Sequence, residues 1–193
     1  MENKTVSRLH EAMSSGTLVR VHRSSIRDAD RLDGFVVGLG AEWTVLALCT
    51  DLRLDGWAAV RTADVTKVRR RGDEDCLTVR VLRRRGRWPV RGPEPALPLD
   101  GLPALARAAS RDFGLVSLHV ERHAPDACWI GEVVEVRPKS LRLREIDTEA
   151  RWRPAPSKFR FEDVTRVDFG GRYERTLLEF AVPVSPARPG TPG

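Results

Sequence analysis

The residues best suited to bind a metal ion lie in one short stretch, HVERH at positions 119–123. Along an extended segment, His119, Glu121 and His123 would share one face, and imidazole and carboxylate groups are ordinary zinc ligands. This face alternates with an apolar one, which indicates that it faces solvent, and no third ligand is apparent beside the two histidines. We therefore expect no metal site and no bound cofactor.

Catalytic signatures are missing from the rest of the sequence. It contains no GxSxG element, no P-loop and no dinucleotide fingerprint. The triplet DFG at 112–114 lacks the glycine-rich loop, the lysine and the HRD element that accompany it in kinases. An enzyme would require another cluster, such as His22, Asp33 and Glu42 gathered in a deep pocket. The sequence predicts a non-catalytic protein.

Positive charge is concentrated in the first half of the chain. The net charge is +6; residues 1–92 carry 18 basic and 12 acidic side chains, whereas residues 93–193 carry 15 of each. Phosphate groups attract such a segment, and an aromatic ring among arginines can stack on a base. A solvated linker with its tryptophan folded back against one domain is the alternative. The candidate residues for contact with nucleic acid or another partner are Lys67, Arg69, Arg70, Arg71, Arg83, Arg84, Arg85, Arg87 and Trp88.

The remaining composition is that of a globular protein. Apolar residues make up 41% of the 193 residues, enough to bury a core. Cys49, Cys76 and Cys128 are far apart and odd in number, which favours neither a disulfide framework nor a zinc ribbon. No segment approaches the roughly 18 apolar residues of a membrane helix, and the first residues lack the apolar stretch of a signal peptide. We expect a cytoplasmic protein without membrane contact.

The sequence contains an internal repeat. ADVTKV at 63–68 returns as EDVTRV at 162–167. Placing Gly34 over Gly131 aligns two alternating segments, DGFVVGLGAEWTVLAL and IGEVVEVRPKSLRLRE, and the repeated element follows both. Because the shared order extends beyond the identical letters, the pattern indicates duplication of a structural unit rather than an active motif.

Each copy shows the same order of expected elements. Apolar residues with helical spacing precede a glycine, at 5–16 and at 100–114. A first strand follows, and then a hairpin with strands at 32–39 and 43–49 in the first copy, and at 129–136 and 140–146 in the second. A looser loop leads to a fourth strand at 57–61 or 158–161. The repeated element then forms a turn and a fifth strand.

These elements divide the chain into four segments. A first repeat covers 1–82, an Arg- and Pro-rich linker 83–99, and a second repeat 100–182. The tail 183–193 has no apolar period and is expected to be disordered. The predicted fold class is mainly β with two helices, built as two tandem small barrels that each consist of a helix and five strands.

A helix followed by five short, bent antiparallel strands resembles the Sm-like fold, within the broader SH3-like class. The resemblance rests on this order, on the repeated element, and on Gly34 and Gly131 in the second strand, where the missing Cβ permits a bend. Asp64 and Asp163 can accept hydrogen bonds from the backbone N–H groups that follow them and so close a turn. We expect these four residues to be structural, and the valines of the repeated element to fill the core.

The resemblance implies RNA binding, but the residues that bind uridine in that family are not found in this sequence. The family uses an aspartate and asparagine pair between the second and third strands, and an arginine and glycine pair near the fourth. At the first place this sequence has GLGAEW and VRPKSL, and at the second RTAD and RFED. The resemblance therefore extends to the fold and not to the RNA-binding residues.

Two functional hypotheses follow. The first is a binding or scaffolding module that acts through protein–protein contacts or self-association, because small barrels leave open strand edges. Such edges could also pair the two copies within one chain. The second is binding of RNA or single-stranded nucleic acid through the basic segment 67–91.

Overall fold

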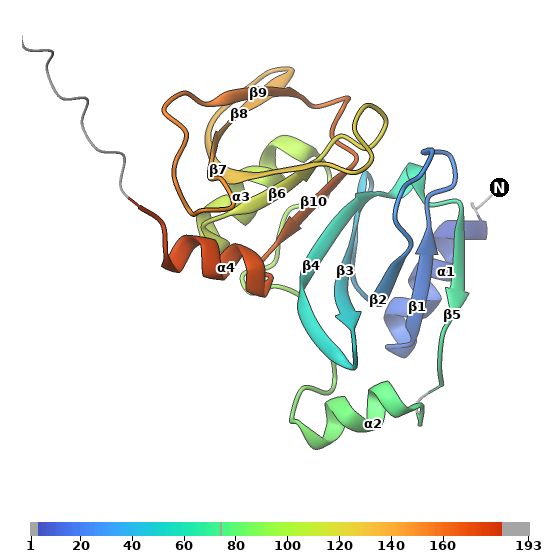
Figure 1. Ribbon diagram of the computed structural model, residues 1–193. Helices are drawn as coiled ribbons and strands as arrows, with labels where there is room; N and C mark the ends of the chain where they lie inside the picture. The colour runs from blue at the N-terminus through green and yellow to red at the C-terminus, as the bar shows by residue number, and fades with distance from the viewer. Residues whose placement is uncertain (1–3, 74, 183–193) are drawn as a thin grey trace, which may run out of the picture.

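The computed structural model describes residues 4–73 and 75–182, and over these residues the chain forms one ten-stranded antiparallel sheet with four helices (Figure 1). The fold is mainly β, as the alternating patterns predict. The first half contains, in order, α1 (Lys4–Ser15), β1 (Leu18–His22), β2 (Leu32–Leu39), β3 (Trp43–Thr50), β4 (Arg53–Arg61), the short 3-10 helix η1 (Thr62–Asp64) and β5 (Lys67–Arg70).

The second half repeats this order of a helix, four strands, a turn and a fifth strand. One difference lies before the fourth strand. In the first half Asp51 and Leu52, both with positive φ, make a tight turn in place of the predicted looser loop, which occurs only in the second half. The elements of the second half are α3 (Leu102–Phe113), β6 (Val116–His119), β7 (Cys128–Arg137), β8 (Ser140–Glu145), β9 (Ser157–Arg160) and β10 (Arg166–Phe169).

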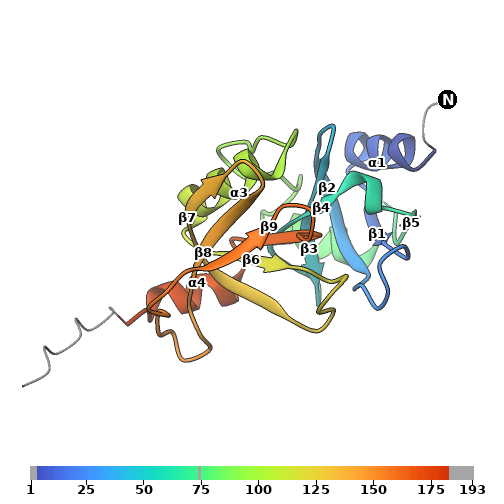
Figure 2. The same cartoon turned by 90° about the horizontal axis from the view of Figure 1, so that it is seen from above.

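The described chain has two helices more than the sequence predicts, so the expectation of two helices is wrong. α2 (Leu77–Arg84) follows β5, and α4 (Arg172–Glu179) follows β10. α2 buries only Val79 and Leu82, and α4 buries only Glu174 and Leu177. Two buried positions among charged residues give too little periodicity to distinguish such a helix from a charged linker. In both ribbon views, α1 and α4 lie at opposite ends of the molecule (Figure 2).

The two halves share one sheet because a strand of each pairs with a strand of the other. The strand order is β5-β1-β2-β3-β4-β10-β6-β7-β8-β9. β4 pairs antiparallel with β10, over residues 57–60 and 166–169. The intramolecular pairing of strand edges, one of the predicted arrangements, is thus present. It covers two edges that would otherwise be exposed.

The sheet is open. β5 and β9 are its outer strands, and no strand of the described chain pairs with both to close it. Each half therefore contributes five neighbouring strands to a single open sheet.

The apolar run WTVLALC is explained by the position of β3, which lies inside the sheet between β2 and β4. Residues 43–47 are all buried, because both faces of β3 are covered. Leu46 on one face packs in the core beneath α1, whereas Trp43 and Val45 on the other face belong to the core around α3. Side chains of the first half thus fill part of the core of the second.

Gly34 and Gly131 lie where neighbouring strands approach closely. A Cβ on Gly34 would lie 2.4 Å from the carbonyl oxygen of Ala47, and one on Gly131 would lie 2.2 Å from that of Arg144. Both obstacles belong to the backbone of the paired strand, β3 or β8. Glycine is therefore required at both positions by the close approach of two backbones.

The substitution Gly131→Ala is expected to lower the free energy of unfolding by about 1–3 kcal/mol, because the added methyl group forces β7 and β8 apart. Chemical denaturation followed by circular dichroism measures the change. Gly34→Ala should behave in the same way. Unchanged stability in both variants would contradict the steric role of these glycines.

The connection between the halves packs against the first half. Trp57 Nε1 donates a hydrogen bond to the carbonyl oxygen of Arg91 at 3.4 Å. The carbonyl oxygen of Leu99 accepts hydrogen bonds from the N–H groups of Glu42, which follows β2, and of Trp43, the first residue of β3. Much of the predicted linker 83–99 is therefore held in place.

The predicted tail 183–193 lies outside the described residues. Within the described part of the chain, no helix is long and apolar enough to cross a membrane.

Candidate functional site

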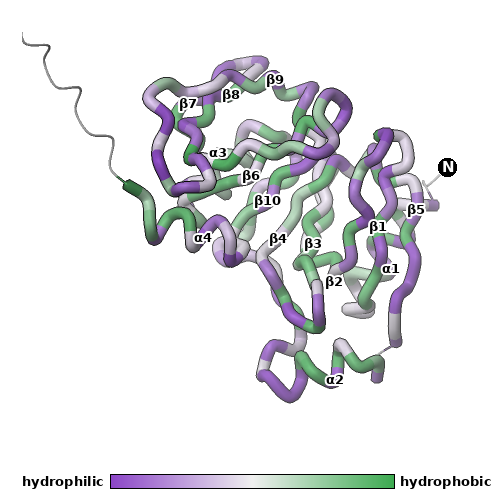
Figure 3. Tube along the Cα trace, viewed as in Figure 1, coloured by the Kyte–Doolittle hydropathy of each residue, from purple (hydrophilic) through white to green (hydrophobic). Residues whose placement is uncertain are grey.

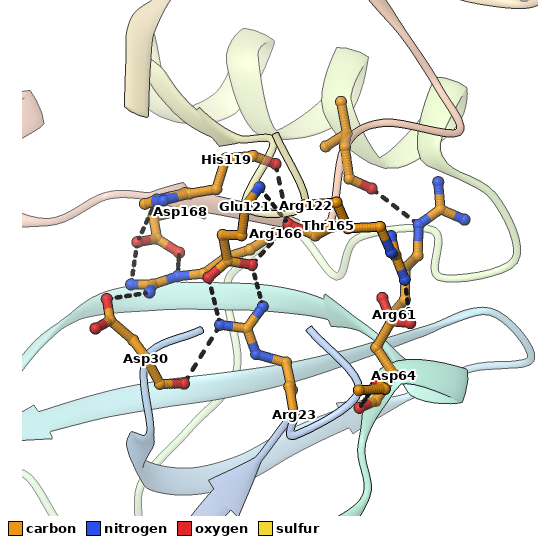
Figure 4. Close-up of polar contacts among 12 residues, drawn as sticks. Arg23, Asp30, Arg61, Asp64, His119, Glu121, Arg122, Thr165, Arg166 and Asp168 are labelled. Atoms are coloured by element: carbon orange, nitrogen blue, oxygen red, sulfur yellow. Dashed lines mark hydrogen bonds and ion pairs between the residues drawn. The ribbon is translucent and has the colours of Figure 1, made fainter. Parts of the chain in front are cut away.

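Charged side chains from both halves meet at the β4–β10 junction (Figure 4). Arg23, after β1, and Glu121, after β6, form a bidentate ion pair. Arg23 Nη2 donates to Glu121 Oε1 at 2.6 Å, and Nη1 donates to Oε2. Their side chains are 0% and 2% exposed. Thr165 Oγ1 donates a further hydrogen bond to Glu121 Oε2 at 2.6 Å. The pair therefore favours one arrangement of the two halves, in which neither buried charge is left alone.

A second charged group lies beside this pair and also joins the two halves. Arg166 Nε donates to Asp168 Oδ1 at 2.6 Å, and Arg166 Nη1 lies 3.4 Å from Asp30 Oδ2 in the first half. His119 Nε2 lies 3.3 Å from Asp168 Oδ2. Arg166 thus has a carboxylate partner in each half.

Arg61, at the end of β4, reaches the turn before β10. Its Nε donates to the carbonyl oxygen of Val164 at 2.8 Å, and its Nη2 donates to that of Phe161. The guanidinium also lies 5.2 Å from the centre of the Trp43 ring. The Arg61 side chain thus provides hydrogen-bond donors for two carbonyl groups of the turn, which would otherwise lack a partner at the junction.

Asp64 and Asp163 lie in turns, but their carboxylates bind side chains. Arg122 Nη2 donates to Asp64 Oδ1 at 2.5 Å, and His123 Nε2 lies 3.2 Å from Asp163 Oδ1. Among the described residues, no backbone N–H group donates to either carboxylate, so the expected turn-closing hydrogen bonds are not formed. Both aspartates instead hold the loop after β6.

Two carboxylates of the junction, those of Glu121 and Asp168, are ionised at neutral pH. Burial alone would raise the pKa of Glu121, but the Arg23 guanidinium and the Thr165 hydroxyl hold it below its ordinary value. Burial opposes the charge of Asp168 in the same way, and Arg166 and His119 lower its pKa. A carboxyl group acts as a general acid near neutral pH only when its pKa is raised, so neither group is suited to that role.

The structure corrects the expectation that the HVERH face is solvent-exposed. Glu121 is only 3% exposed, because the first half packs over it and supplies Arg23. Its two histidine neighbours separate: His119 faces Asp168, whereas His123 lies in the exposed loop. Within residues 4–73 and 75–182, no group of three or more His, Cys, Asp or Glu side chains is placed to hold a metal ion.

The suggested catalytic cluster is not assembled. Asp33 lies at the start of β2 and binds Arg20, while Glu42 follows the end of the same strand. The length of β2 places the backbone positions of these two residues about 20 Å apart along the strand, at roughly 3.3 Å per residue.

β5 carries the first group of predicted basic residues. Because side chains alternate along a strand, Lys67, Arg69 and Arg71 lie on one face. Arg70 lies on the other, beside Val68, which is buried beneath α1. All four basic side chains are exposed, and β5 is hydrophilic over most of its length (Figure 3). The strand thus divides these residues between two faces.

One of these faces forms a cationic cluster around His22, which we call the basic edge. The pKa of His22 is lowered first by its burial, and then by four positive neighbours that disfavour its protonation. Within the described part of the chain, one carboxylate, that of Asp33, contacts the cluster. The residues of β1 and the following loop could not be predicted from the sequence, because the pairing of β1 with β5 brings them here. The basic edge consists of Arg20, Arg31, Lys67, Arg69 and Arg71.

The second group of predicted basic residues ends α2. Arg83 and Arg84 lie in its last turn and Arg85 is its C-cap, where positive charge stabilises the helix dipole. Arg83 Nη1 lies 3.3 Å from Asp75 Oδ1, and its guanidinium lies 5.6 Å from the centre of the Trp88 ring. These arginines therefore have local roles.

Trp88 folds back against the first half, as one of the two alternatives predicts. Its ring meets Phe35 edge to face at 5.8 Å, and it packs in the same cluster as Leu82 of α2. Trp88 nevertheless remains half-buried. Together with Arg87 it lines a groove between the two halves.

Comparisons of the chain with protein-family models, curated proteins and solved structures gave no match. Function is therefore inferred from the geometry of these sites.

Proposed function

We propose that the chain is a non-catalytic binding module whose basic edge contacts single-stranded nucleic acid. One observation carries the proposal: five cationic side chains gather on one face of β1, β5 and the adjacent loop, and among the described residues Asp33 is the single carboxylate in contact with them. The four positive neighbours that, after burial, disfavour protonation of His22 also attract phosphate electrostatically.

The fold of each half is a second part of the proposal. A helix, five strands and a glycine at the close approach of the second and third strands occur twice. We propose on this basis that each half is an Sm-like unit. In both halves the fifth strand neighbours the first, and in the first half this neighbouring pair carries the basic edge.

The double variant Lys67→Ala/Arg69→Ala is expected to weaken binding of mixed-sequence RNA about tenfold at low salt. Two lost phosphate contacts should also reduce the slope of log affinity against log salt concentration by about 1.4. Fluorescence anisotropy with labelled RNA at several salt concentrations measures both quantities.

The matched control is Lys158→Ala/Arg160→Ala, which removes the same charge from exposed positions of β9 at the other edge of the sheet. This variant should retain the affinity and the salt dependence. The proposed function would be contradicted if the unmodified protein bound RNA with micromolar or weaker affinity and the variant Lys67→Ala/Arg69→Ala bound it equally well.

Self-association is the second candidate, and the β4–β10 pairing favours it. Within the molecule, the fourth strand of the first half, β4, pairs with the fifth strand of the second half, β10. The two outer strands are also a fourth strand, β9, and a fifth strand, β5, so the same pairing could join two copies of the chain. Two features oppose this contact. Both outer strands are short, and both expose basic side chains that would repel each other. The molecular mass in solution at low and high salt distinguishes the two candidates.

A further inference from the structure

A groove of about 970 Å³ lies between the two halves. The start of β4, the segment 86–92, the end of α3, Gly170 and α4 all contribute to its walls. Its volume is at the upper end of the range of about 300–1,000 Å³ that is usual for small-molecule sites. The groove exists only because the two halves are joined.

Aromatic rings in fixed positions form part of the wall. Trp57 stacks on Phe169 with ring centroids 5.9 Å apart and contacts Phe113 at 5.3 Å. Trp88 is held edge to face against Phe35. Trp57 and Trp88 are both half-buried, so each ring is anchored by packing and still partly accessible. Such rings bind planar groups with little loss of side-chain entropy.

Arginine side chains form a further part of the wall. Arg87, Arg91, Arg172 and Arg175 line the groove. Among the described residues, no hydrogen bond or ion pair is formed by the guanidinium of Arg87 or of Arg91, and both side chains are exposed. Two arginines without an acidic partner beside aromatic rings favour an anionic ligand with a planar part.

Among the described residues, one carboxylate, that of Asp112, lines the groove, and it is already neutralised. Arg111 binds it through two hydrogen bonds, Nε to Oδ1 at 2.7 Å and Nη2 to Oδ2 at 2.9 Å. The groove thus carries an excess of positive charge.

We propose that this groove binds a mononucleotide, with its phosphate at Arg87 and Arg91 and its base against the tryptophan rings. The site is separate from the basic edge, because β2 and β3 lie between β1 and β4 in the sheet. It therefore adds a small-molecule ligand to the proposed nucleic-acid contact and does not depend on it.

Isothermal titration calorimetry of the full chain with AMP tests the proposal. One AMP should bind per chain, and adenosine and inorganic phosphate should each bind at least about tenfold more weakly, since each lacks half of the recognised groups. Arg87→Ala and Arg91→Ala should each weaken AMP binding about tenfold, the loss expected for one charge-assisted contact.

Arg84→Ala is the control, because Arg84 is an exposed arginine on α2 that does not line the groove. Arg84→Ala and Lys67→Ala/Arg69→Ala should bind AMP as the unmodified protein does. The double variant distinguishes the two proposals. The proposed function predicts weaker RNA binding by Lys67→Ala/Arg69→Ala, whereas the mononucleotide site predicts that its AMP binding is unchanged.

Three results would overturn the mononucleotide site. They are no saturable AMP binding at millimolar concentration, phosphate binding as tight as AMP binding, and AMP binding that Arg87→Ala and Arg91→Ala leave unchanged. Trp88→Phe provides a further variant, which retains an aromatic ring at the Phe35 contact. It should weaken the binding of AMP more than the binding of phosphate.

Discussion

Residues 1–92 alone are expected to be insoluble or unfolded, although they contain all the elements of the first half. Trp43 and Val45 are buried in the full chain within the core around α3, which this fragment lacks. Exposing one tryptophan of about 150–250 Å² costs about 4–6 kcal/mol at 25 cal/mol per Å². That is a large fraction of the roughly 5–15 kcal/mol that stabilises a domain.

The fragment also loses two polar features of the junction. β4 becomes an open edge, since β10 is its only partner on that side, and buried Arg23 loses Glu121. Solubility, size-exclusion chromatography and circular dichroism of the fragment test the expectation, with co-expressed residues 93–193 as the control that should restore folding. A monomeric fragment with cooperative unfolding would show that the halves are independent modules.

Glu121→Ala is expected to lower the free energy of unfolding by about 3–5 kcal/mol, the cost of leaving a buried charge without its partner. The charge in question is Arg23, whose side chain is fully buried. The double variant Arg23→Met/Glu121→Met should recover most of the loss, because it removes both charges and retains apolar volume. Urea denaturation of Arg23→Met, Glu121→Met and the double methionine variant measures the coupling.

If Glu121→Ala costs less than about 1 kcal/mol, the pair contributes no more than an exposed one. The pH dependence gives an independent measurement. The pKa values of Glu121 and Asp168 are lowered in the folded protein, so their contribution is complete above the ordinary carboxyl value of about 4 and is lost as pH falls through the folded values. Acid unfolding of the double methionine variant should therefore be less steep.

Much of the fold could be predicted from short-range patterns. The predicted second strand at 32–39 is β2, and the predicted fourth strand of the second copy overlaps β9. Alternation and turn residues are sufficient here, because each strand buries side chains against near neighbours in the sequence. Gly34 and Gly131 were also identifiable, since the repeat aligns them.

The candidate sites could be predicted only in part. Lys67 and Arg69 belong to the basic edge, but Arg20 and Arg31 join them through strand pairing and loop position. Trp88 and its neighbour Arg87 line the groove, yet the opposite wall comes from α4, which has too few apolar residues to be recognised.

The sequence by itself determined the duplication, the order of strands within each copy and the excess of positive charge in the first half. These properties depend on local periodicity and composition, which a single chain displays directly. The tertiary structure alone decided how the copies meet: Arg23 and Glu121 stand 98 positions apart, and only the β4–β10 pairing brings them into contact. Register across such a distance is set by the packing of both halves together, and for this reason the shared core, the buried ion pairs and the groove have no local signature.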